Sequence, residues 1–171
     1  MIPIPTGPPP PPRLLPVSVE WERSRKLRLL IAGIALMTGS PVVVLVGMAW
    51  MFVLPAGGHP LAWIAVLMIG VSGLFSWLLG LCTLLGQRYF RGGTIDVAGA
   101  RPLLRQSVVL CAGTACANGL GLAVLSLVFF GRADEVNPEL LIYLLVVAVP
   151  MVMAVIACPL MFKSLRPEPR F

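Results

Sequence analysis

Apolar residues fill four long segments of this chain, and charged residues stand only between these segments or at the ends. Residues 29–54, 61–85, 107–130 and 140–162 contain no Lys, Arg, Asp or Glu. Each segment is longer than the roughly 20 residues that an α-helix needs to cross a ~30 Å hydrocarbon layer. The pattern predicts an all-α integral membrane protein with a bundle of four transmembrane helices.

The polar stretches divide the chain around these helices. The connections at 55–60 and 131–139 are too short for anything but turns, so each joins two antiparallel helices. We expect a proline-rich arm with an interfacial turn at 1–28, a first transmembrane hairpin at 29–85, a basic loop at 86–106, a second hairpin at 107–162 and a tail at 163–171. In the basic loop, Thr94 and Ile95 favour extended chain, and glycines at 92, 93 and 99 are expected to interrupt any helix.

Basic residues predict the orientation of the bundle. Of the 13 Lys and Arg residues, all but Arg132 fall on one side of the predicted membrane. Positive charge in short loops stays on the cytoplasmic side, so both termini and the basic loop are expected in the cytoplasm. The net charge of +6 then reflects topology and attraction to anionic lipid headgroups, and we expect no nucleic-acid partner. The arginines expected to contact lipid or a partner protein are Arg88, Arg91, Arg101 and Arg105.

Residue usage and the amino-terminal arm add two expectations. Arg outnumbers Lys, and with 17 Gly and 17 Pro this usage is typical of a GC-rich bacterial genome, which favours the bacterial plasma (inner) membrane. Prolines 8–12 predict a stiff polyproline II spacer. Pro8, Pro11 and Arg13 also fit a PxxPxR ligand pattern for aromatic-lined grooves, so linker and ligand both stay open.

Small residues line the third segment at helical spacing. In lipid, helices associate through close backbone approach, and small residues four positions apart permit it. We therefore expect the third helix to be central, in contact with the first and second. The two adjacent stripes of small residues are Gly113, Ala117 and Gly121, and Ala115, Gly119 and Ala123.

A set of polar residues and one proline falls near the middle of the predicted membrane. The set comprises Thr38, Ser40, Ser72, Ser76, Asn118 and Pro150. The amide of Asn118 cannot be left unbonded in hydrocarbon without a cost of several kcal/mol, so we expect a partner on a facing helix. The set is either a packing device that joins the helices or a small polar site on a permeation path.

Catalytic and metal chemistry find no support in the sequence. The four apolar segments hold no ionisable residue except cysteine and tyrosine, and no acid–base pair, activated nucleophile or metal-ligand cluster can be assembled at one depth. We expect no enzyme activity and no cofactor, and we interpret the four cysteines as packing residues.

Two functional hypotheses remain. The first is a non-catalytic accessory or scaffolding subunit of a larger plasma-membrane complex, in contact with membrane lipids and with other membrane-protein subunits or further copies of itself. The alternative is a small oligomeric transporter, lipid translocator or channel with the polar set around Asn118 at its centre. A weak similarity between residues 36–40 (LMTGS) and 110–114 (LCAGT) fits either a duplicated hairpin, as found in transporters, or a chance match between apolar segments.

Overall fold

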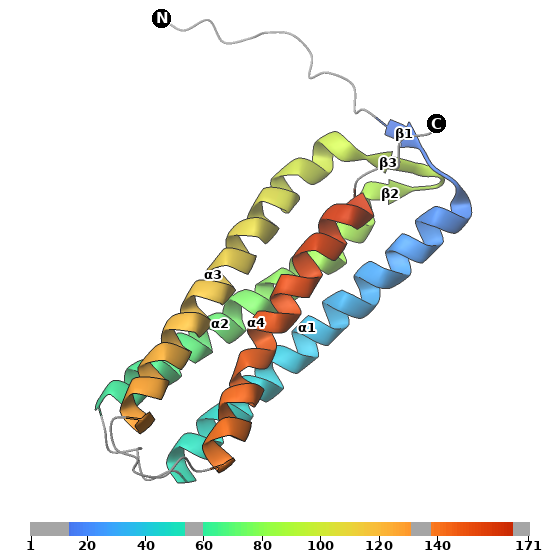
Figure 1. The fold of residues 1–171 in the computed structure, drawn as a ribbon. Helices are drawn as coiled ribbons and strands as arrows, with labels where there is room; N and C mark the ends of the chain where they lie inside the picture. The colour runs from blue at the N-terminus through green and yellow to red at the C-terminus, as the bar shows by residue number, and fades with distance from the viewer. Residues whose placement is uncertain (1–13, 54–59, 131–137, 166–171) are drawn as a thin grey trace, which may run out of the picture.

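Four long helices account for nearly all of the chain that the structure describes, which is residues 14–53, 60–130 and 138–165 of a computed structural model. The helices are α1 (Val19–Val53), α2 (Pro60–Leu85), α3 (Val97–Phe130) and α4 (Pro138–Leu165). They run side by side as an elongated bundle (Figure 1). Within these residues, four helices are long and apolar enough to cross a membrane, which confirms that part of the sequence prediction.

Helices α1 and α3 both begin well before their uncharged segments. Ser18 precedes α1, and its Oγ accepts a hydrogen bond from the Trp21 backbone N–H at 3.2 Å. Asp96 precedes α3, and its Oδ1 accepts one from the Gly99 N–H at 2.9 Å. Such caps satisfy backbone donors that the first turn leaves unpaired. The segment expected to form an interfacial helix turn is the first part of α1. The second half of the expected loop is also helical, so the expectation that Gly99 interrupts a helix is wrong.

A small antiparallel sheet closes one end of the bundle, which the expectation of an all-α fold did not include. Its strands are β1 (Leu14–Pro16), β2 (Phe90–Arg91) and β3 (Thr94–Asp96), in the order β1-β3-β2, and a short 3-10 helix, η2 (Gly86–Tyr89), leads into β2. Gly92 and Gly93 form the two-residue turn between β2 and β3 with φ of 52° and 82°, a conformation that suits glycine. We call this sheet the cap, and the end of the bundle that carries it the basic end.

Glycines bring α2 close to its two neighbours. A Cβ added to Gly33 of α1 would lie 2.6 Å from a side-chain atom of Leu84 on α2. A Cβ added to Gly80 of α2 would lie 2.9 Å from a side-chain atom of Met37 on α1. Between α3 and α2 the corresponding distances are 2.8 Å at Gly113 and 3.1 Å at Gly121. Helix α2 has the broadest contacts with α1 and α3 and also touches α4, so α2 is the central helix and the expectation that α3 is central is wrong.

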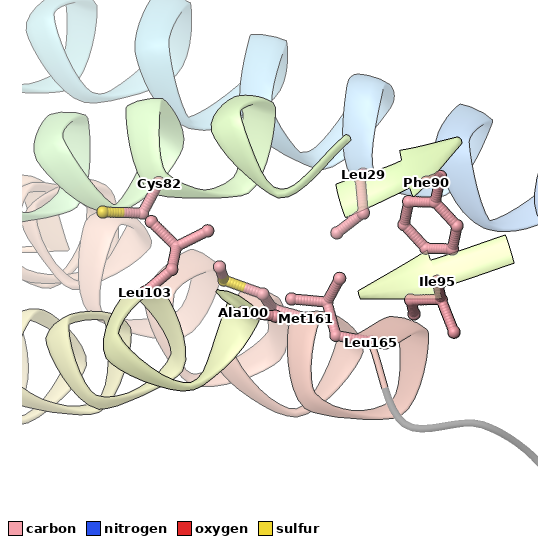
Figure 2. Close-up of a cluster of buried hydrophobic side chains, with 8 residues drawn as sticks. All are labelled: Leu29, Cys82, Phe90, Ile95, Ala100, Leu103, Met161 and Leu165. Carbon is pink, nitrogen blue, oxygen red and sulfur yellow. The ribbon is translucent and has the colours of Figure 1, made fainter. Parts of the chain in front are cut away.

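Large apolar side chains gather at the basic end, beneath the cap (Figure 2). All four helices and the cap contribute to this cluster. Its buried members are Leu29, Cys82, Phe90, Ile95, Ala100, Leu103, Met161 and Leu165. Phe90 and Ile95 are only 4% and 0% exposed, so the cap is attached to the bundle by two deeply buried side chains.

Candidate functional site

The polar residues expected near the middle of the membrane divide into an interior group and one surface residue. Ser40, Ser72, Ser76 and Asn118 are each 0% exposed, and Pro150 of α4 is also fully buried. We call these five residues the polar belt. Thr38 stays on the surface of α1, where its Oγ1 donates a hydrogen bond to the Ile34 carbonyl of the same helix at 2.8 Å. Thr38 therefore does not belong to the interior group.

Direct polar contact joins α1 to α2 within the belt. The Ser40 Oγ donates a hydrogen bond to the Ser76 Oγ at 2.9 Å. In hydrocarbon this bond gives the Ser40 O–H an acceptor on another helix. The pair lies beside a close helix contact, because the Ser40 carbonyl oxygen is 3.8 Å from where a Cβ on Gly73 would lie.

Asn118 enters the belt from α3. Gly113 of α3 lies against Phe75, and Gly121 lies against Ile69, so Asn118 is close to the depth of Ser72 on α2. The Ser72 Oγ is buried and makes no hydrogen bond to any residue that the structure describes. The belt therefore brings three small hydroxyls and one amide together among α1, α2 and α3, and it is made by packed side chains.

The two stripes of small residues on α3 face different ways. Gly113 and Gly121 contact α2, and Ala117 between them is 8% exposed. On the other stripe, Gly119 has no atom within 4 Å of an added Cβ, Ala115 is half-buried and Ala123 is exposed. The first stripe thus packs against α2, whereas the second is only partly covered.

The outward face of α3 carries its own row of small residues. Ala112, Cys116 and Ala123 are exposed, and Gly119 completes the row at spacings of three and four positions. Such spacing places all four on one side of a helix. We call these four residues the outward seam. Among the described residues, no side chain reaches the open position at Gly119.

The four candidate arginines do not form one cluster. Arg88 and Arg91 line a pocket of about 310 Å³ together with Tyr89, Thr94 and Asp96. Arg105 lines a separate groove of about 550 Å³ between α2 and α3. Arg101 is exposed and is part of neither wall.

A third cavity involves an arginine that the sequence did not single out. It is a groove of about 300 Å³ between α1 and α4, with Arg28 at one end. Its walls are otherwise apolar, from Ala32 and Ala35 on α1 and Met153 and Ala157 on α4. The groove opens on the side of the bundle, at the basic end.

A buried carboxylate connects the cap to α1, and sequence reasoning missed it. Glu22 is 7% exposed, and its Oε2 accepts a hydrogen bond from the Gly93 N–H in the β2–β3 turn at 2.6 Å. Its Oε1 pairs with the Lys26 Nζ at 2.6 Å, one helical turn away. The spacing of Glu22 and Lys26 was visible in the sequence. The contact with Gly93 was not, because 71 positions separate the two residues.

Aromatic contacts complete this attachment. The Trp21 ring lies 6.0 Å from the Phe90 ring of β2, centroid to centroid. The guanidinium carbon of Arg25, whose residue is only 6% exposed, lies 5.1 Å from the centre of the Trp21 ring. A buried cation over an indole face is a favourable contact. Arg25 of α1 is therefore buried beside the cap and differs from the exposed arginines around it.

The described part of the chain holds no group of three or more His, Cys, Asp or Glu side chains placed to bind a metal ion. The Cys111 Sγ donates a hydrogen bond to the Ala154 carbonyl oxygen at 3.5 Å, which is a contact between α3 and α4.

Comparisons with protein-family models, with curated proteins and with solved structures gave no match.

Proposed function

We propose that this chain is a non-catalytic accessory or scaffolding subunit of a larger plasma-membrane complex, and that the outward seam of α3 receives a transmembrane helix of another subunit. The observation that carries this proposal is the division of the small residues of α3 between two faces. One face packs inside the bundle, and the other is turned away from it.

Small residues turned toward lipid have a physical consequence. Burying apolar surface from lipid supplies no drive for helix association, so close packing and interhelical hydrogen bonds decide which helices meet. At Gly113 and Gly121 the missing side chains bring α3 against α2. The outward seam repeats the same spacing where no helix of the described chain covers it. It therefore offers another helix an equally close approach.

The packed belt supports the accessory role over a permeation path. A path for a polar substrate needs side chains in contact with water, whereas Ser40, Ser72, Ser76 and Asn118 are all fully buried. The cavities at Arg28, Arg88 and Arg105 have no belt residue in their walls. Ser40 and Ser76 instead bond to each other. Buried, mutually bonded side chains of this kind favour a role in helix packing.

The decisive experiment compares two glycines at similar depth. Gly119 on the outward seam and Gly70 on α2 both have no atom within 4 Å of an added Cβ, so each accepts a larger side chain without a clash inside the chain. The tagged wild type, Gly119→Leu and Gly70→Leu are purified from membranes in mild detergent, and co-purified proteins are quantified by mass spectrometry. We expect the same membrane subunit with the wild type and Gly70→Leu, and at least a tenfold loss with Gly119→Leu.

Two outcomes would contradict the proposal. Either no membrane protein accompanies the wild type, or Gly119→Leu and Gly70→Leu retain it equally.

A second copy of this chain as the partner is recognised through Cys116, which is exposed on the outward seam. A bifunctional thiol reagent would then link two copies, and Cys116→Ser would abolish the link.

A further inference from the structure

We propose that the two lateral grooves at the basic end each bind one anionic phospholipid, with its phosphate on Arg28 in one groove and on Arg105 in the other. This inference needs only that the four helices lie in a membrane. It does not depend on the accessory role or on the outward seam.

The two grooves share one design although different helices build them. The first lies between α1 and α4, and the second lies between α2 and α3. Their volumes of about 300 and 550 Å³ fall in the range of small-ligand sites. Apart from the arginines and Gln106, their walls are made of apolar residues and Cys82. Walls of this kind suit a hydrocarbon chain.

Each arginine lies at the outer end of its groove. From Arg28 the first groove follows α1 inward to Ala35, and seven residues at 1.5 Å rise give about 10 Å. The second groove follows α2 from Leu85 to Leu78, the same length, with Arg105 beside its outer end. A phospholipid has this order of parts, with an anionic phosphate at the surface and an acyl chain directed inward. The grooves therefore match its shape and its charge together.

The two guanidinium groups are available to a ligand. Among the residues that the structure describes, neither Arg28 nor Arg105 forms an ion pair with a carboxylate. Arg25, by contrast, is buried against Trp21. Guanidinium binds phosphate through two parallel hydrogen bonds, which is stronger and more specific than a single point contact. Arg28 and Arg105 are thus suited to select anionic headgroups over zwitterionic ones.

The cavity at Arg88 and Arg91 is a poorer match to a lipid. The pocket at Arg88 and Arg91 also has the carboxylate of Asp96 in its wall, and this negative charge opposes an anion. Its other lining residues are Leu14 and Thr94 of the cap and Tyr89 of η2, and they form no apolar channel into the bundle. The lipid proposal is therefore limited to the two lateral grooves.

Native mass spectrometry with defined lipids tests the proposal. Purified protein in mild detergent is titrated with phosphatidylglycerol or with phosphatidylcholine of identical acyl chains, and the bound molecules are counted. We expect two tightly bound phosphatidylglycerol molecules and weaker binding of phosphatidylcholine. Each change, Arg28→Gln or Arg105→Gln, should weaken one of these sites about fivefold toward phosphatidylglycerol, the usual effect of one basic residue at an anionic membrane surface. Arg28→Lys should restore part of the loss at the first site.

Matched controls separate groove binding from general charge. Arg23→Gln and Arg101→Gln remove the same charge at the same end, from exposed residues outside both grooves, and should leave the two sites unchanged. Ala35→Leu fills the inner part of the first groove and should lower the number of tightly bound phosphatidylglycerol molecules by one. The proposal is overturned if the wild type binds both lipids equally, if the control arginines matter as much as Arg28 and Arg105, or if Ala35→Leu has no effect.

Discussion

The polar belt and the apolar cluster beneath the cap are both buried, but their side chains are of opposite kinds. The belt is built from serines and one asparagine on helices that approach closely at glycines. The cluster is built from large apolar side chains such as Leu29, Ile95 and Leu165. Polar contacts are thus added to apolar ones such as Leu36 with Leu79 in the middle of the bundle, whereas the buried cluster at the basic end is apolar throughout.

The surrounding solvent explains this contrast. Lipid tails are as apolar as leucine, so burying leucine from lipid supplies no hydrophobic drive, and hydrogen bonds and close packing hold the helices together. At the basic end, exposed charged residues such as Arg23 and Arg101 mark the transition to water, where burial of apolar area is favourable again. The cap is therefore expected to depend on the hydrophobic effect, and the belt on a few weak polar contacts.

The largest effect is expected in the cap. Ile95→Ala removes a side chain that is 0% exposed and leaves a cavity, so the free energy of unfolding should fall by about 2–5 kcal/mol. Leu14→Ala in β1 is the matched control, because Leu14 is 48% exposed. Unfolding is followed by thermal denaturation in detergent. Equal shifts for the two variants would show that the cap does not stabilise the bundle.

The next effect concerns the carboxylate that attaches the β2–β3 turn. Glu22→Ala leaves the Gly93 N–H without its acceptor and removes the ion pair with Lys26, which should cost about 1–3 kcal/mol. Glu22→Gln keeps an acceptor and should recover part of this loss. Glu20→Ala, an exposed neighbour on the same helix, should have little effect. Hydrogen exchange at Gly93 is the specific measurement, and exchange that stays slow in Glu22→Ala would refute the attachment.

A smaller effect is expected in the belt. A double-mutant cycle of Ser40→Ala and Ser76→Ala should give a coupling energy of about 0.6 kcal/mol, the average for hydrogen bonds between membrane helices. Ser72→Ala should be neutral, because its hydroxyl has no hydrogen-bond partner among the described residues. Coupling above about 2 kcal/mol would place the belt on the same scale as the cap and remove the contrast between them.

No labelling by thiol reagents is expected for a cysteine placed in the belt, which makes this the smallest of the predicted effects. In a background without Cys82, Cys111, Cys116 and Cys158, Asn118→Cys should not react with membrane-impermeant thiol reagents, because position 118 is fully buried. Arg91→Cys, exposed at the basic end, serves as the reactive control when the reagent is added to both sides of opened membranes. Rapid labelling at 118 would reveal a water-filled path and favour the transporter alternative.

The sequence by itself determined the number of long apolar helices, because hydrocarbon accepts only segments that satisfy their own backbone hydrogen bonds and carry few charges. It also indicated which polar residues lie at one depth. It could not show that Ser40 meets Ser76 while Thr38 bonds only to its own helix, since neighbouring positions on one helix point in different directions.

Tertiary structure decided which face of each helix is inside. The two stripes of small residues on α3 look alike in the sequence, yet only the one with Gly113 and Gly121 packs against α2. The cap was equally hidden, because β1 pairs with β3 across some eighty residues. Periodicity records which residues share a face and at what depth they lie. The choice of neighbour depends on how all the helices fill space together, and only the folded chain settles it.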